Sequence, residues 1–188
     1  MSKPKIINFS GYARSGKDTS ANILKQKLED RGYKVLHINY ADYLKYIAKS
    51  YFGWDGTKSP EMRTLLQHLG TEKARSKDPD FWVDTVIRFV NVFGDDYDFV
   101  VIGDCRFSNE VLKWIYNDYD VYSVHVTRLN FDNGLTKEQK AHPSETSMDN
   151  FDFDYYIKAE TLDELNNEVN KLVEWLYERG VIWSKNYS

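Results

Sequence analysis

The stretch KIINFSGYARSGKDT, residues 5–19, decides the fold. It begins with a short, apolar and partly β-branched run, residues 5–9, of the kind that forms a buried strand. A turn with two glycines follows, and from Lys17 to about residue 31 apolar residues recur at helical spacing until Gly32 ends the pattern. A strand that runs through a glycine turn directly into a helix is how a βαβ unit starts, so the sequence predicts an α/β fold.

The turn has the spacing Gly11-x-x-x-x-Gly16-Lys17. A phosphate chain needs backbone N–H groups that it can approach closely, which is why glycines suit such a turn, and the N-terminus of the next helix adds partial positive charge. Lys17 would then bridge the terminal phosphates of a nucleotide. The alternative is a plain glycine turn, but the position between a strand and a helix favours a phosphate-binding loop.

After the second glycine, Asp18 stands where this motif commonly has the Ser or Thr that binds Mg²⁺, and Thr19 follows one residue later. Either the Thr19 hydroxyl or Asp18, acting through a water, would help to hold the metal ion. The alternative is that Asp18 simply suits the first turn of a helix. The expected ligands are ATP and Mg²⁺.

A second signal is the strand-like run at residues 99–102, which is followed by Gly103 and Asp104. An acid at the carboxyl end of a central parallel strand lies near the phosphate loop, because ligands gather at that edge of the sheet. Asp104 would orient Mg²⁺ or its waters, or accept a proton. Its alternative role is to cap a helix or to lie in a loop. Arg106, two residues further on, would pair with phosphate or with Asp104.

Arginine positions carry information because the chain has only eight of them. Five lie at turns, at expected strand ends or in polar stretches: Arg14, Arg63, Arg75, Arg106 and Arg128. Guanidinium groups bind phosphate oxygens through two parallel hydrogen bonds, so several that converge suit phosphoryl transfer. Beside a phosphate loop, they indicate a kinase that grips two phosphates at once.

Strand-like and helix-like segments alternate along the rest of the chain. Strands are expected at 34–38, 119–127 and 153–157, and helices at 42–52, 60–74, 80–93 and 161–179, with one more helix capped by Ser108. This order predicts right-handed βαβ units in three layers, with about five parallel strands and helices on both faces. We see no linker, so residues 1–188 are expected to form a single domain. The polar stretch from residue 128 to 150, which contains Gly134 and Pro143, is expected to be a mobile excursion.

Composition excludes several classes of protein. The 188 residues carry a net charge of −4, and 41% of them are hydrophobic, so the chain has enough apolar residues for a core and is not disordered as a whole. The single cysteine, Cys105, excludes an internal disulfide, and the four histidines lack zinc-ligand spacing. No signal peptide or membrane span is recognisable, so a cytoplasmic protein is expected, without stable nucleic-acid binding.

Five segments, taken in order, resemble the phage-type deoxynucleoside monophosphate kinases, a branch of the P-loop nucleoside monophosphate kinases. They are residues 11–19 (GYARSGKDT), 40–45 (YADYLK), 63–75 (RTLLQHLGTEKAR), 78–83 (DPDFWV) and 104–110 (DCRFSNE). The resemblance spans about residues 5–150, and Gly-Lys-Asp-Thr is that family's own variant of the phosphate loop. The presence of Asp18 in place of the common Ser or Thr therefore supports the resemblance to this family.

The resemblance implies roles for individual residues. The loop residues Gly11, Ser15, Gly16, Lys17, Asp18 and Thr19 would bind the ATP phosphates, with Asp18, Thr19 and Asp104 near the metal and Lys17, Arg14, Asp104 and Arg128 in catalysis. The acceptor would lie in a helical region, about residues 40–93, against Asp42, Lys45, Arg63, Gln67, Gly70, Thr71, Arg75, Trp82 and Arg106. Core packing explains Trp82 almost as well as stacking on the acceptor does. Residues 128–149 would be a lid, with His142 and Glu145 as polar contacts beside Arg128.

The implied reaction transfers the γ-phosphoryl group of ATP to the 5′-phosphate of a deoxynucleoside monophosphate. Two other interpretations stay open: a related kinase that acts on another small phosphate or on a modified base in DNA, and a nucleotide-dependent switch or ATPase module. The sequence also leaves open whether the chain forms a homodimer, and which bases it accepts. If the chain is phage-encoded, the expected location is the host cytoplasm.

Overall fold

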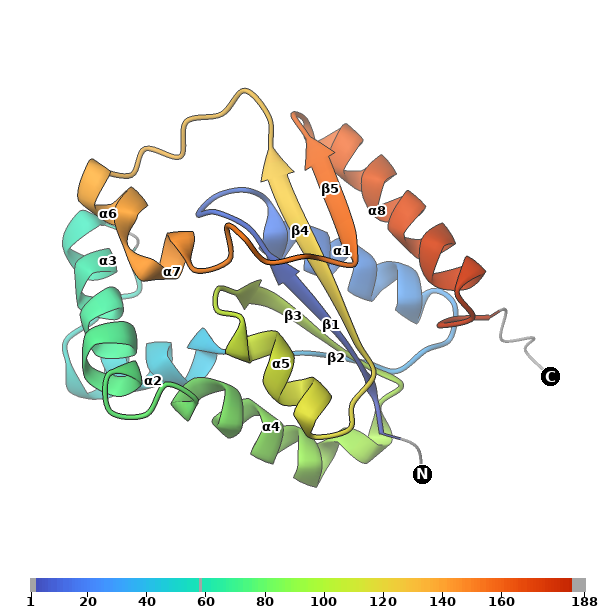
Figure 1. Ribbon diagram of the computed structural model, residues 1–188, viewed down its shortest axis with the longest axis horizontal. Coiled ribbons are helices and arrows are strands. Elements are labelled where there is room, and N and C mark those ends of the chain that lie inside the picture. The colour runs from blue at the N-terminus through green and yellow to red at the C-terminus, as the bar shows by residue number, and fades with distance from the viewer. Residues whose placement is uncertain (1–2, 58, 184–188) are drawn as a thin grey trace.

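The computed structural model describes residues 3–57 and 59–183. Residues 1–2 and 184–188, the ends of the expected 1–188 domain, and residue 58 lie outside the described residues. A parallel sheet with strand order β2-β3-β1-β4-β5 forms the middle of the molecule (Figure 1). The strands are β1 (Lys5–Ser10), β2 (Val35–His37), β3 (Phe99–Cys105), β4 (Val121–Arg128) and β5 (Tyr155–Ala159). The expectation of about five parallel strands is confirmed.

Helices cover both faces of the sheet, which gives the three layers expected from the sequence. They are α1 (Lys17–Glu29), α2 (Ala41–Tyr51), α3 (Pro60–Gln67), α4 (Phe81–Phe93), α5 (Asn109–Tyr116), α6 (Lys137–Ala141), α7 (Pro143–Thr146) and α8 (Leu162–Glu178). One core cluster packs α1 and α8 on one face, and a second packs α4, α5 and the start of α2 on the other. Among the described residues, no helix combines the length and apolar character needed to cross a bilayer.

The central strand β1 accounts for the position of the glycine turn. It pairs with β3 on one side and β4 on the other, and its apolar residues are fully buried. Because all five strands are parallel, their carboxyl ends share one edge of the sheet. The turn after β1 and the acid after β3 therefore meet at that edge.

Two predicted helices differ in detail from the expectation. The sequence predicted a helix over residues 60–74, and the chain is helical there, but the second half is a π-helix, η1 (His68–Arg75), that follows α3. Ser108 is the N-cap residue of α5, but its side chain makes no capping hydrogen bond. The Glu110 carboxylate instead holds the turn before α5, because it accepts the N–H groups of Arg106 (2.6 Å) and Phe107 (3.1 Å).

The polar stretch after β4 contains more regular structure than the sequence predicted. Arg128 is the last residue of β4, and residues 137–146 form the short helices α6 and α7. Thr136 and Gln139 form a reciprocal capping box at the start of α6. Figure 1 shows α6 and α7 on the same side of the molecule as α3. Whether this stretch opens stays a prediction.

Candidate active site

The glycine turn has the backbone geometry that a phosphate loop requires. Gly11 and Gly16 have φ of 145° and 98°, which is the region that glycine adopts without strain. A β-carbon at Gly11 would lie 2.3 Å from the carbonyl oxygen of Val126 on β4, so no side chain fits there. Gly16 is the N-cap of α1, and the helix N-terminus faces the loop.

Lys17 begins α1 and is buried, with 5% of its surface exposed. Its Nζ donates to the carbonyl oxygen of Tyr12 at 3.3 Å. Burial, followed by the charge of Arg106, lowers the pKa of Lys17 to about 8, although Asp18 and Glu145 oppose the shift. A buried ammonium with so few partners is ready to gain stabilisation from an anion.

A cavity of about 370 Å³ connects the phosphate loop with the helical region that follows β2. Most predicted site residues line it: Arg14, Lys17, Asp18, Lys45, Arg63, Gln67, Gly70, Thr71, Arg75, Trp82, Asp104, Arg106 and Glu145. Gly11, Ser15, Gly16, Thr19, Asp42, Arg128 and His142 are outside its lining. The structure therefore brings the expected donor and acceptor residues to one cavity.

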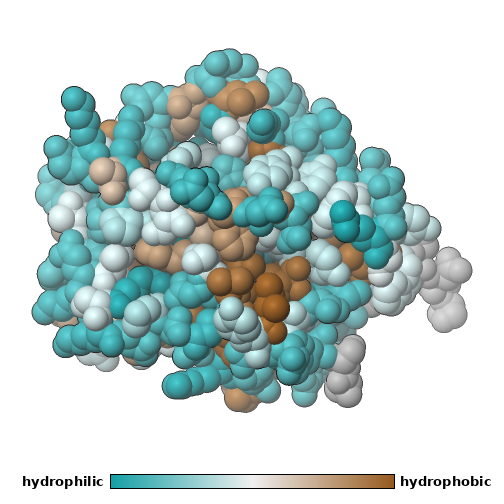
Figure 2. Space-filling view, viewed as in Figure 1, coloured by the Kyte–Doolittle hydropathy of each residue, from teal (hydrophilic) through white to brown (hydrophobic). Residues whose placement is uncertain are grey.

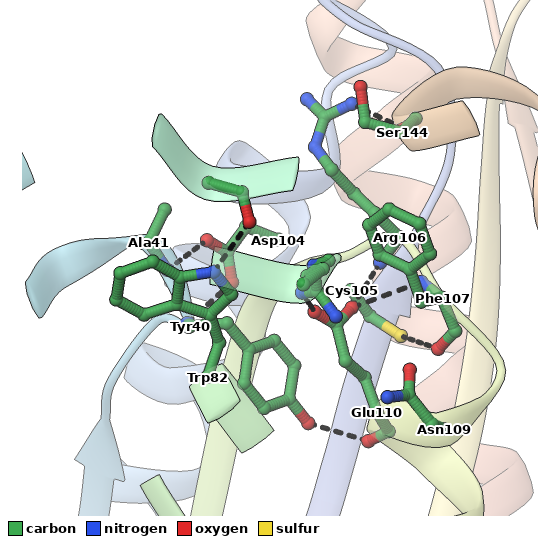
Figure 3. Close-up of polar contacts among 12 residues, drawn as sticks. Tyr40, Ala41, Trp82, Asp104, Cys105, Arg106, Phe107, Asn109, Glu110 and Ser144 are labelled. Carbon is green, nitrogen blue, oxygen red and sulfur yellow. Dashed lines mark hydrogen bonds and ion pairs between the residues drawn. The ribbon is translucent and has the colours of Figure 1, made fainter. Parts of the chain in front are cut away.

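Asp104 binds the backbone at the start of α2. Its two carboxylate oxygens accept the N–H groups of Tyr40 and Ala41, each at 2.9 Å (Figure 3). Asp104 thus caps a helix, which is the alternative role considered from the sequence, but the helix is α2 and not the one that follows in the chain. Burial raises the pKa of Asp104, and the two backbone hydrogen bonds oppose that rise.

Asp18 lies at the edge of the sheet beside Gly103, the residue before Asp104. A β-carbon added at Gly103 would lie 3.3 Å from Asp18 Oδ1, so the glycine leaves room for that carboxylate. Asp18 lines the cavity, whereas Thr19 is exposed and lies outside its lining. In the described part of the chain, no three or more His, Cys, Asp or Glu side chains are grouped to hold a metal. Two carboxylates beside a phosphate loop fit Mg²⁺, which takes most of its other ligands from phosphates and water.

Arg106 pairs with Glu145 and does not form the expected pair with Asp104. Its guanidinium donates to Glu145 and to the carbonyl oxygen of Ser144, the latter at 2.8 Å (Figure 3). Glu145 also accepts the N–H of Ala13 in the phosphate loop at 2.7 Å, and only 4% of its side chain is exposed. A loop N–H group and a guanidinium thus converge on one carboxylate, the arrangement that would suit a phosphate.

The phosphate loop makes further contacts with the stretch after β4. Tyr12 donates to Asp149 at 2.7 Å, and Arg14 donates to the carbonyl oxygen of Asn133 at 3.0 Å. The Asp149 carboxylate raises the pKa of Tyr12 to about 12. These contacts join residues 128–149 to the loop.

Two predicted lid residues are placed away from the cavity. Arg128 is exposed, and its guanidinium lies 4.0 Å from the ring centroid of Phe131. His142 is the N-cap of α7, and its Nδ1 lies 2.8 Å from Ser144 Oγ. In this conformation neither residue reaches the loop, so a role at the phosphates requires movement.

The acceptor side is built on the π-helix. Trp82 is buried, and its Nε1 donates to the carbonyl oxygen of Gly70 at 2.9 Å. A β-carbon at Gly70 would lie 2.8 Å from the Leu44 side chain, so η1 approaches α2 closely. Trp82 thus fixes the π-helix in addition to lining the cavity. Arg63 lines the same cavity, and burial, followed by the charge of Arg14, lowers its pKa.

Glu110 also lines the cavity, but it was not among the site residues predicted from the sequence. Its carboxylate pairs with Arg75, and only 2% of the side chain is exposed. Its one sequence signal was its place at the end of the 104–110 segment. A glutamate in the first turn of a helix is usually exposed, so the pattern alone did not predict burial.

Comparisons with solved structures find several similar chains. The APS kinase CysC of Mycobacterium tuberculosis in complex with AMPPNP and APS is 12% identical, with a TM-score of 0.56 over 94% of this chain and 99% of that one. Two others are a Cys556Ala mutant of the same kinase (14% identity, 93% and 99% coverage, TM-score 0.49) and APE1195 (15%, 95% and 96%, 0.47). No family model and no curated protein sequence match the chain.

The molecule therefore has the three-layer α/β fold of a P-loop kinase. At these identities the likeness concerns the fold alone, and the activity is argued from the site.

Proposed function

We propose that this protein is an ATP-dependent kinase that phosphorylates the 5′-phosphate of a deoxynucleoside monophosphate. The observation that carries the proposal is the single cavity shared by the phosphate loop and by a second set of cations, Lys45, Arg63, Arg75 and Arg106. Several cations that converge on one cavity suit a reaction between two phosphates. The residue-by-residue resemblance of five segments supports the choice of acceptor.

ATP would bind with its phosphates along residues 11–19. The loop N–H groups and the N-terminus of α1 would hold the phosphate oxygens, and Lys17 would neutralise charge on the transferring group. The lowered pKa of Lys17 supports this role, because a bound phosphate would restore the charged form of an amine that is partly neutral near pH 8. Arg14, which lines the cavity from the same loop, would add a second cation.

Asp18 and Asp104 would hold Mg²⁺ on the side of the loop that faces β3. When bound, the ion would reduce the negative charge on the phosphate oxygens during transfer. Asp104 would act there while it caps α2, because each carboxylate oxygen has a lone pair beyond the one used by its backbone N–H partner.

The acceptor would lie between η1 and the loop after β3. An acceptor phosphate is already a nucleophile, so the reaction needs no strong general base, and positioning and charge neutralisation supply most of the catalysis. Gln67 and Thr71, which line the cavity, would contact the base or sugar. Residues 128–149 would exclude water over the phosphates and so suppress hydrolysis of ATP.

The test is a coupled assay of ADP release with the four deoxynucleoside monophosphates, their ribonucleotides and modified pyrimidine monophosphates as acceptors. A kinase of this class releases ADP rapidly only when one of these acceptors is present. ADP release that is equally fast without an acceptor would identify an ATPase or a switch. Release that depends only on an oligodeoxynucleotide carrying a modified base would identify the DNA kinase alternative.

A further inference from the structure

Arg75, the predicted contact to the acceptor phosphate, is held from three directions. Its Nη2 donates to Glu110, its Nη1 donates to the carbonyl oxygen of Pro79 at 3.2 Å, and its guanidinium carbon lies 4.0 Å from the ring centroid of Phe107. The side chain is 11% exposed and still lines the cavity. A guanidinium has five N–H donors, so these contacts leave donors for an anion.

Glu110 joins this arginine to the loop that carries the next one. One carboxylate oxygen pairs with Arg75, and the other accepts the N–H groups of Arg106 and Phe107. Figure 3 shows the Glu110 side chain beneath that loop, with Arg106 extending away from it toward Ser144. Glu110 therefore connects the end of the π-helix with the turn after β3.

The backbone of Glu110 is fixed as firmly as its side chain. Its carbonyl oxygen accepts the Tyr40 hydroxyl at 2.6 Å and the Asn8 amide at 3.1 Å. Tyr40 lies at the start of α2 and Asn8 is on the central strand, and both side chains are buried. A carboxylate anchored to the sheet in this way has a defined position relative to the phosphate loop that follows the same strand.

From this geometry we infer that Glu110 is a positioning residue that holds Arg75 in the orientation that binds the acceptor phosphate. The inference rests on the proposed function only where it identifies this phosphate as that of the acceptor. The positioning role itself requires only that Arg75 binds a phosphate group. The buried ion pair with Glu110 restricts the Arg75 side chain before the substrate binds. Less conformational entropy of Arg75 is then lost on binding, which increases the affinity for the substrate. Glu110 acts through Arg75 and makes no contact with the reacting atoms.

Glu110→Gln isolates this role. The amide oxygen of glutamine replaces the acceptor of the Arg106 and Phe107 N–H groups, while its NH₂ group faces Arg75 and offers no acceptor. The KM for the best deoxynucleoside monophosphate should rise by about tenfold or more, the size expected for a lost hydrogen bond to a charged group, with the KM for ATP within about twofold. Asp84→Asn is the matched control, since it breaks the Lys113–Asp84 ion pair (3.1 Å) between α4 and α5 away from the cavity.

A binding measurement separates this inference from the proposed function. With AMPPNP saturating the phosphate loop, inorganic phosphate is titrated and followed by ³¹P NMR in the wild type, Glu110→Gln, Arg75→Gln and the double variant. Both single variants should weaken phosphate binding, Arg75→Gln at least as much as Glu110→Gln, and the double variant should match Arg75→Gln, because residues that act as one unit are not additive. If the four proteins show this pattern of phosphate binding but the wild type has no kinase activity, the proposed function fails and the positioning role stands.

The opposite outcomes overturn the inference. They are a folded Glu110→Gln protein with wild-type KM and phosphate affinity, additive effects in the double variant, or a wild-type cavity that binds no phosphate beside AMPPNP. If Glu110→Gln does not fold, the comparison of Arg75→Gln with the double variant decides, because the double variant lacks both charges of the buried pair and so leaves neither charge buried alone. Weaker phosphate binding in that double variant than in Arg75→Gln would place the action of Glu110 elsewhere.

Discussion

Replacing Lys17 with methionine should make the nucleotide-free protein more stable while it removes activity. The pKa of Lys17 falls from 10.5 to about 8 because the ammonium is buried. A difference of about 2.5 pKa units corresponds to about 3 kcal/mol of unfavourable free energy for the charged form in the folded protein. The lost hydrogen bond to Tyr12 offsets about 1 kcal/mol of this, so we expect a gain of about 2 kcal/mol at pH 7.

The gain should depend on pH in a defined direction. Between about pH 8 and pH 10.5 the unfolded chain binds the Lys17 proton more strongly than the folded protein does, so wild-type stability rises with pH across this window. The advantage of Lys17→Met is therefore largest below pH 8 and shrinks toward pH 10.5. Urea unfolding of the nucleotide-free proteins at pH 7 and pH 10 measures both free energies. Turnover should fall by a factor on the order of 10³, since charge stabilisation in a dry site is worth several kcal/mol.

Lys25→Met is the control, because Lys25 is on the same helix but forms a partly exposed ion pair with Glu29 at 2.8 Å. Such a pair is worth about 1 kcal/mol or less, and its loss should show no stability gain and leave turnover unchanged. A Lys17→Met protein that is less stable at pH 7, or whose advantage is the same at both pH values, would refute the argument from burial. Retained turnover would remove Lys17 from the proposed site.

Three further predictions concern the other side chains at the loop. Asp104→Asn should lose turnover more than ATP affinity. It should also lose about 1 kcal/mol of stability in denaturant unfolding, because one of its two acceptors for the α2 N–H groups is gone. A loss of stability with full turnover would leave Asp104 only its capping role. Glu145→Gln breaks the ion pair with Arg106, so hydrogen exchange across residues 133–149 should become faster in the nucleotide-free protein. Unchanged exchange would show that this carboxylate does not stabilise the segment against opening. Arg128→Ala should lower kcat more than ATP affinity if residues 128–149 move over the phosphates, whereas a wild-type kcat would confine Arg128 to its stacking on Phe131.

The features predictable from sequence were those with a local pattern. The strand, turn and helix of residues 5–29 follow from adjacent residues, and Asp104 was placed correctly at the carboxyl edge of the sheet. Residue types and spacing thus predicted which side chains would line the cavity better than they predicted what each side chain would bind.

The remaining features depend on contacts between residues far apart in the chain. The change to a π-helix at residue 68 accompanies the Trp82 hydrogen bond to Gly70 and the close packing of Gly70 on Leu44, and none of these is visible in the pattern of residues 60–74. The pairing of Arg106 with Glu145 joins residues 39 positions apart, so sequence reasoning, which considered a phosphate or Asp104 as the partner, did not predict it.

The strand order has a consequence for how the chain is made. The central strand β1 is synthesised first, but its partners are residues 99–105 on one side and 121–125 on the other. Until β4 leaves the ribosome, the apolar residues of β1 have no complete sheet to enter, and closing loops of this length slows folding. Nascent chains should therefore expose β1 until β4 emerges and recruit chaperones there. A product truncated before residue 126 would also lack the backbone against which Gly11 packs, so the phosphate loop should form only after residue 126 has left the ribosome.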